Sequence, residues 1–384
     1  MTTPRRRRLA ALACALAALC LGAAWAQPPR TPAAKDYYVG TVAPAGGTEE
    51  PLLLDLSLWD DGFAFARLQL PGRHEVLLGA GRLEGGSDLR LVLRRALPGE
   101  DPWWSAALAR AAAAGEAEPE QAGETVAVLS ADRDYGWAAE GRTLAGVLRL
   151  ATGEPLRLTA TRLASEARWS FDMGRVSSAA VLPRFPGLEG LSSWLVDGAL
   201  PPARGFAAEG LAMHDAGELG WGWWREERVD LTGVAGPYLS LLSTIDDYTG
   251  GAHPNSLTGS HLLAVRGDDV ASLGLADLFA GGGWLEELSA LVLAGLAEQG
   301  ALWVTQGQVS ELDASDLAVF TLDAAGVTFH FSPYLMGPYA QGSFRVTVPY
   351  GALAGLAAPG GPLDSFARGD APALDGEAPV GGGG

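Results

Sequence analysis

The sequence predicts an α+β protein in which a β-meander precedes a second, mixed domain. Three observations carry this prediction. Apolar and polar residues alternate over residues 36–165, one helical apolar stripe falls at 284–299, and short strand-like runs surround that stripe. Period-two alternation is typical of half-buried antiparallel strands, and apolar residues spaced three and four apart are typical of an amphipathic helix. We therefore divide the chain into residues 1–26, 36–165, 168–356 and 357–384.

Residues 1–26 have the form of an export signal. Four arginines at 5–8 precede an apolar run at 9–22, and the small-x-small order AWA occupies 24–26. The apolar run is shorter than the ~20 residues that span a bilayer. Cys14 and Cys20 lie inside it without the residue order that lipid attachment requires. We expect cleavage and release to the periplasm or the exterior, with no membrane span afterwards, rather than a retained anchor or a lipoprotein.

The mature protein is expected to be strongly acidic and free of cysteine. The formal charge is −18, and removing four arginines gives −18 − 4 = −22. Such a charge repels nucleic acid and anionic membranes and attracts cationic partners. Because lysozymes are commonly basic, the sign suits a lysozyme as partner, although general solubility explains it equally. Lys35 is the only lysine, which we attribute to codon usage rather than to function.

The stretch 36–165 is predicted to form about eight short strands, as in a small barrel or sandwich. Leucines at 52, 54, 56 and 58 alternate with residues of the opposite face. One insertion interrupts the series, with a helix start at 101–102, an alanine-rich stretch to 114 and an acidic loop after it. Trp103 and Trp104 lie on this helix. We expect both to pack it down, with an exposed binding role as the alternative.

Residues 169–236 give a weaker pattern. A strand end at 185–188 leads into what we expect to be a short helix. Trp221, Trp223 and Trp224 then precede a run of charges. Such a cluster can be a platform for a carbohydrate or protein, or the inner face of a sheet. We favour the inner face, because large exposed apolar patches are rare on monomers.

Two stiff loops are the most informative features of the second domain. Residues 248–255 read YTGGAHPN and join two apolar runs, whereas residues 331–342 read FSPYLMGPYAQG and join the predicted strands 327–331 and 344–348. Adjacent glycines permit backbone angles closed to other residues, and prolines fix their own φ. We therefore expect the two loops to come together and to hold polar and aromatic tips in fixed positions. A hairpin turn at 323–326, one main helix packed on an antiparallel sheet and a disordered acidic tail from 357 complete this part.

Together these motifs resemble a bacterial envelope domain of unknown function. It forms the ectodomain of the lysozyme-sensing anti-sigma-V factor and accompanies some peptidoglycan deacetylases. The resemblance rests on YTGGAHPN, on DLF at 277–279, on the stretch 326–342 and on VTVPY at 346–350. It covers residues 238–356 and extends more weakly back to 168. It implies an extracellular binding role towards lysozyme or the wall, and the deacetylase chemistry of some relatives belongs to a separate catalytic domain.

The chemistry-bearing residues leave two interpretations open. Asp246 and Asp247 near His253 could serve a wall hydrolase as general acid and base. Alternatively, the histidine and Asn255 hold the loop in shape. Because metal-ligand spacings and known catalytic motifs are missing, we expect a binding protein rather than an enzyme, without metal or cofactor. Its partner is expected to be a basic protein such as lysozyme, or a cell-wall glycan. The predicted binding residues are Tyr248, Gly250, Gly251, His253, Asn255, Tyr334 and Tyr339.

Overall fold

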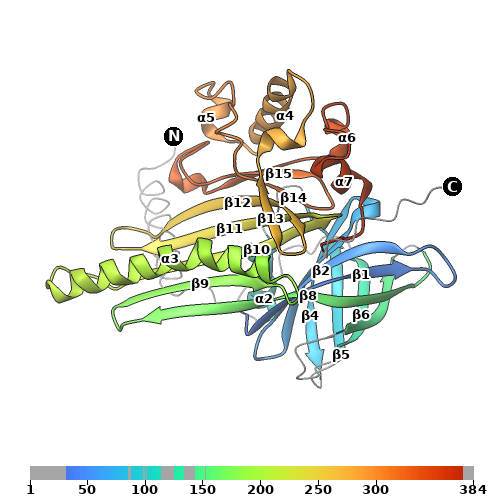
Figure 1. Cartoon of the computed structure of the whole chain (residues 1–384), viewed down its shortest axis with the longest axis horizontal. Helices are drawn as coiled ribbons and strands as arrows, with labels where there is room; N and C mark the ends of the chain where they lie inside the picture. Colours follow the sequence, from blue (N-terminus) through green and yellow to red (C-terminus); the bar gives the residue numbers. More distant parts are fainter. Residues whose placement is uncertain are drawn as a thin grey trace, which may run out of the picture.

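A computed structural model describes residues 32–84, 88–97, 100, 102–113, 125–133, 143–151 and 153–374 (Figure 1). The predicted signal at 1–26 lies outside these residues, as do the side chains of Trp103 and Trp104. In the described part of the chain, no helix combines the length and the hydropathy needed to cross a membrane.

The first part is an eight-stranded barrel, so the barrel alternative of the predicted meander holds. Each strand pairs antiparallel with the next, and the first closes the barrel by pairing with the eighth. The even-numbered leucines of the second strand point into the barrel core, whereas Leu53 points outward. Helix α2 (Pro102–Ala113) packs outside. The strands are β1 (Ala34–Ala43), β2 (Glu50–Leu58), β3 (Phe63–Leu70), β4 (Glu75–Glu84), β5 (Asp88–Arg95), β6 (Thr125–Arg133), β7 (Thr143–Leu150) and β8 (Leu156–Asp172).

Strand β8 leaves the barrel and carries the sheet onward. Its first half pairs with β1 and β7, and its second half pairs with β9 (Val176–Arg184). The sheet then continues through β10 (Trp223–Ala235), β11 (Tyr238–Tyr248), β12 (Asn255–Arg266) and β13 (Asp269–Leu273). The boundary that the sequence placed between residues 165 and 168 therefore falls inside one strand.

Helix α3 (Glu189–Asp215) connects β9 to β10, which run parallel, and covers one face of this extension (Figure 1). A crossover helix of this kind is the usual link between parallel strands. The prediction of a short helix here, and of one main helix in the domain, was wrong. Pro201 and Pro202 suggest an end, but both face solvent, and the buried stripe runs past them from Leu191 to Gly210.

The opposite face carries a second, three-stranded sheet with α4 (Trp284–Glu298) on its outer side. This sheet consists of β14 (Phe320–Leu322), β15 (Val327–Phe331) and β16 (Phe344–Val348), and the predicted hairpin at 323–326 joins its first two strands. The layers are therefore α3, large sheet, small sheet and α4. Shorter helices are η1 (Pro71–Arg73), η2 (Leu275–Leu278), α5 (Leu302–Thr305), η3 (Tyr339–Gln341), α6 (Tyr350–Leu353) and α7 (Pro362–Arg368).

The predicted disordered tail is ordered from residue 357 to residue 374. Helix α7 buries Leu363 and Phe366 in the core beneath α4, and Leu374 packs in the core beneath α3. The backbone of Leu374 also accepts a hydrogen bond from the N–H of Gly267 at 2.9 Å. Two apolar side chains spaced three apart suffice to anchor a short helix, although glycine and proline dominate the composition around it. Residues 375–384 lie outside the described part.

A cluster of buried charges lies where the barrel meets the extended sheet. Lys35 on β1 is 4% exposed, and its Nζ lies 2.5 Å from Asp230 Oδ1 on β10 and 3.2 Å from Asp55 Oδ2 on β2. Beside it, Arg228 on β10 forms an ion pair with Glu166 on β8. The single lysine is thus a buried structural residue, which the attribution to codon usage overlooked.

Candidate functional site

The polar side chains of the loop 248–255 form hydrogen bonds within the loop itself. Gly250 and Gly251 have φ of +110° and +112°, in the region that favours glycine. The hydroxyl of Tyr248 donates to the carbonyl of Gly251 at 3.0 Å, and Nδ1 of His253 lies 2.9 Å from the carbonyl oxygen of Pro254. The loop therefore has the internal bracing that its glycines and proline predict.

The second loop, at 332–342, packs against the first. The rings of His253 and Tyr339 stack with centroids 3.8 Å apart and planes 15° apart. The hydroxyl of Tyr339 donates to the carbonyl of Pro254 at 3.1 Å, and the ring of Tyr334 lies 5.4 Å from that of Tyr339. The prediction that the two loops come together is confirmed by these contacts.

Tyr334 is held in an unusual conformation at the outer edge of this contact. Its φ is +71°, although residues with a Cβ rarely adopt positive φ, and its side chain is 57% exposed. The neighbouring Leu335 is 51% exposed. A strained aromatic residue that is also exposed is typical of functional sites rather than of packing.

Trp221 belongs to the same surface, although the sequence favoured placing the tryptophan cluster in a core. It is 63% exposed, and a Cβ at Gly250 would lie 2.9 Å from its Cδ1. The indole therefore lies directly against Gly250, and a side chain at that position would displace it. Trp223 behaves as predicted, since it is half-buried and contacts Phe206 on α3. We call Trp221, Tyr248, His253, Tyr334 and Tyr339 the two-loop surface.

The two carboxylates of the hydrolase interpretation point in different directions. Asp246 and Asp247 are successive residues of β11, so their side chains lie on opposite faces of the sheet. Asp247 lies 3.8 Å from Arg225 and accepts a hydrogen bond from Asn255 at 3.1 Å. Among the described residues, no hydrogen bond joins His253 to either carboxylate. The three groups therefore do not form a shared catalytic arrangement.

Asp246 instead lies on the face that carries the small sheet. Burial raises the pKa of its carboxyl group, and the carboxylates of Glu226 and Asp247 raise it further against a hydrogen bond from Ser256. Burial also raises the pKa of Tyr339, with a smaller contribution from Asp246. The phenol of Tyr339 is therefore a stable hydrogen-bond donor at neutral pH. In the described part of the chain, no cluster of three His, Cys, Asp or Glu residues could hold a metal ion.

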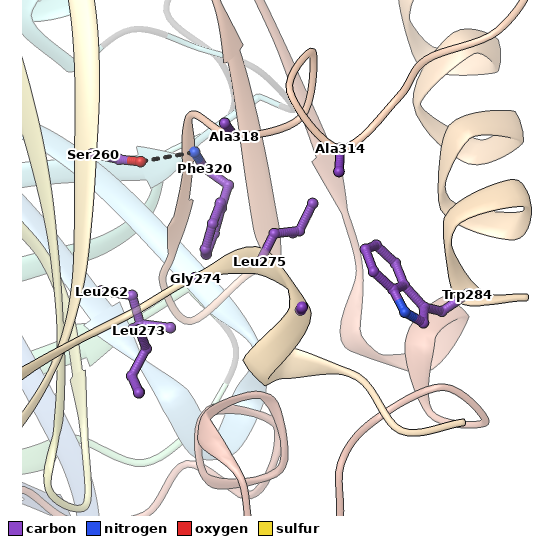
Figure 2. A pocket seen from close by; sticks show the side chains of 10 residues that line it. Ser260, Leu262, Leu273, Gly274, Leu275, Trp284, Ala314, Ala318 and Phe320 are labelled. Carbon is purple, nitrogen blue, oxygen red and sulfur yellow. Dashed lines mark hydrogen bonds between the residues drawn. The ribbon is translucent and has the colours of Figure 1, made fainter. Parts of the chain in front are cut away.

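A separate apolar pocket of 330 Å³ opens between the large sheet and the α4 layer (Figure 2). Figure 2 shows Trp284 on one side and Leu262 and Leu273 on the other, with Ser260 Oγ accepting the N–H of Phe320 at 2.9 Å. Its size is at the lower end of the range for ligand pockets. The sequence pattern did not reveal it, because its lining comes from β12 and β13, from η2 and α4, and from the segment 314–320: Ser260, Leu262, Leu273, Gly274, Leu275, Ala276, Trp284, Ala314, Ala318 and Phe320.

The fold and this surface define a two-part β-rich protein whose loops present an aromatic surface. Residues 276–351 match the family described as "Protein of unknown function (DUF3298)", so the chain contains a DUF3298 domain there. The match includes the second loop and begins after the first. This match gives no evidence for the anti-sigma-V ectodomain in particular, and no curated protein matches.

Two solved structures of DUF3298 proteins are similar to part of the chain. A family member from Bacteroides fragilis NCTC 9343 is 15% identical, with a TM-score of 0.38 over 53% of this chain and 95% of its own. A family protein from Pseudomonas aeruginosa PAO1 is 19% identical, with a TM-score of 0.37 over 51% of this chain and 93% of its own.

Proposed function

We propose that this is an exported, non-catalytic binding protein whose two-loop surface contacts a cell-wall-active enzyme of the lysozyme type, or a wall glycan. The observation that carries the proposal is the stack of His253 on Tyr339, fixed by the hydrogen bond from the Tyr339 hydroxyl to Pro254. Rigid aromatic side chains supply contact area at little entropic cost. A surface that is already ordered without a ligand loses less entropy on binding.

Charge and chemistry support binding over turnover. The acidic sequence attracts basic proteins, as lysozymes commonly are. Exposed aromatic rings such as Trp221 also stack on apolar faces of sugars and proteins alike. The Nδ1 atom of His253 is within hydrogen-bond distance of the backbone carbonyl of Pro254, and one face of its ring stacks on Tyr339. Among the described residues, no carboxylate hydrogen-bonds to it and orients it for proton transfer.

The hydrolase with Asp246, Asp247 and His253 remains the second candidate, favoured by the raised pKa of Asp246 alone. Its test is turnover of purified peptidoglycan by the wild type and by His253→Ala and Asp246→Asn variants. Turnover that either substitution abolishes, in a protein with unchanged circular dichroism, would support catalysis over binding.

The binding proposal is tested by calorimetric titration at low salt with hen-type lysozyme and, separately, with soluble peptidoglycan fragments. We expect binding of one of them, weakened about tenfold or more by Tyr339→Ala, because central aromatic residues dominate interface energies. The control is Leu97→Ala, at a 69% exposed position just after barrel strand β5, which should leave the affinity unchanged. Binding of neither probe at low salt would refute the proposal.

A further inference from the structure

Half of strand β12 has no neighbouring strand on its outer edge. The pairing with β13 begins at Leu262, so residues 255–261 have no strand there within the described part of the chain. The N–H of Val265 donates to Pro237 on the β11 side, so even-numbered residues direct their N–H and C=O groups outward. Among these, the N–H of Thr258 already donates to Ser332 Oγ at 3.1 Å, so a chain that pairs along the whole segment replaces this bond. A strand edge without a neighbouring strand is a ready template for another extended chain.

This open half of β12 connects the two-loop surface to the apolar pocket. Its first residue, Asn255, ends the first loop, and Ser332 begins the second. At its other end, Ser260 and Leu262 line the pocket, where β13 turns away at Gly274 (Figure 2). An extended chain along this edge would therefore meet both features.

The surroundings of the pocket are acidic. Residues 267–344 contain no lysine or arginine. Exposed acids stand beside the lining residues in the sequence: Asp277, Glu286, Glu287, Asp313 and Asp316. Hydrogen bonds from Ser315 and from backbone N–H groups lower the pKa of Asp313, so its carboxylate stays ionised well into the acidic range. Charge complementarity therefore selects a basic occupant.

We propose that a basic, extended segment of a protein partner adds to residues 255–261 of β12 and places one apolar side chain in the pocket beside Trp284. Strand addition takes its affinity from main-chain hydrogen bonds and its specificity from a pocket for alternate side chains. The inference rests on the proposed binding function and deepens it, since it identifies the partner as a protein with a lysine- or arginine-rich strand rather than a glycan.

The probe is a fluorescein-labelled peptide of sequence Thr-Lys-Thr-Leu-Thr-Lys-Thr, titrated at low salt and followed by anisotropy. In a strand, its leucine and lysines share one face, which places the lysines on the side of the pocket and its acids, and its threonines share the other face. We expect saturable binding that weakens about tenfold or more when leucine is replaced by glycine, because the buried side chain is lost. The scrambled order Thr-Thr-Lys-Leu-Lys-Thr-Thr, which moves the lysines to the face opposite the leucine, should also bind more weakly.

Matched variants of the protein locate the site. Ala318 lines the pocket and is exposed, so Ala318→Phe should fill the pocket without disturbing a core and should weaken peptide binding about tenfold. Ala297 is equally exposed near the far end of α4, and Ala297→Phe should change nothing. The inference would be overturned if the peptide did not bind at low salt. It would also be overturned if neither replacing the leucine by glycine nor Ala318→Phe weakened peptide binding.

The failure of this inference can be told apart from failure of the proposed function. If lysozyme or glycan binds through Tyr339 while the peptide does not, the two-loop surface stands and the strand-addition site is refuted. If the peptide binds with the expected variant pattern while neither wall probe does, the pocket stands and the proposed partners are refuted.

Discussion

Replacing Lys35 by methionine should destabilise the protein by several kcal/mol. The Nζ atom lies 2.5 Å from Asp230 and 3.2 Å from Asp55, which at an effective dielectric of 20 gives gross attractions of about 7 and about 5 kcal/mol. Removing the charge from water offsets much of this. Burial lowers the pKa of Lys35, yet the two carboxylates raise it overall, so the attraction outweighs the desolvation. We expect a loss of about 3–5 kcal/mol, as for other buried pairs broken on one side.

The assay is urea unfolding followed by circular dichroism at pH 7, with two further variants. The double variant Lys35→Met/Asp230→Asn also removes the buried negative charge of Asp230. It should recover part of the lost unfolding free energy, because the amide can still accept the hydrogen bond from Tyr37. Arg368→Met removes the ion pair between Asp364 and Arg368, whose side chain is 51% exposed. It should lower the unfolding free energy by less than about 1 kcal/mol. A Lys35→Met loss below about 1 kcal/mol, or no recovery in the double variant, would refute this account of the junction.

The sign of the pH dependence adds a second test of the same cluster. Burial raises the pKa of Asp55 and of Glu166, so each folded carboxyl binds its proton more tightly than the unfolded one. Stability from these groups therefore falls as the pH rises through their raised folded-state pKa values. Without Lys35 both carboxylates lose a compensating charge. The Lys35→Met variant should consequently lose less stability relative to the wild type at pH 5 than at pH 7.

Two further predictions concern other sites. Burial lowers the pKa of His330 to about 3, so between pH 6.5 and 3 the unfolded chain takes up a proton that the folded one does not; from pH 7 to 5 this should cost about 2 kcal/mol. His330→Gln should remove that slope in urea titrations, and an unchanged slope would contradict the assignment. Gly250→Ala should cost about 1–3 kcal/mol and shift the tryptophan emission, because its φ is positive and its Cβ would meet Trp221. Gly251→Ala is the control, because Gly251 also has a positive φ but a Cβ added there would contact nothing. Equal emission shifts in both variants would exclude the Trp221 contact.

Sequence patterns predicted the elements whose structure depends on neighbouring residues, such as turns and amphipathic segments. The hairpin at 323–326, strands β15 and β16 and helix α4 follow from turn residues and periodicity, and they appear within a residue of the predicted bounds. Helix α3 could not be predicted in the same way, because Pro201 and Pro202 signal an end to any local reading. Only the buried stripe against β9 and β10 sustains the helix beyond them.

The candidate site was predictable to the same extent. Glycine and proline spacing singled out both loops, and their physical stiffness is what lets His253 and Tyr339 stack. Trp221 was missed because it packs against Gly250, which follows the end of another strand, β11, and is not its neighbour in the sequence. The buried role of Lys35 was missed for the same reason, since its partners Asp55 and Asp230 lie on strands that only the closed barrel and its extension bring together.

The position of the barrel bears on how the two-loop surface is held. Tyr37 and Leu53 of the barrel pack in the same core as α3 and β11, and Ser165 pairs with β1 on one side and with β9 on the other. Strand β11 ends at Tyr248 in the first loop, so this loop stands on a core that the barrel completes. Cutting the chain between residues 165 and 168 would expose both the packing partners of Tyr37 and the charged side chain of Arg228. The barrel is therefore a structural support for the two loops, because it completes the core of the sheet that presents them.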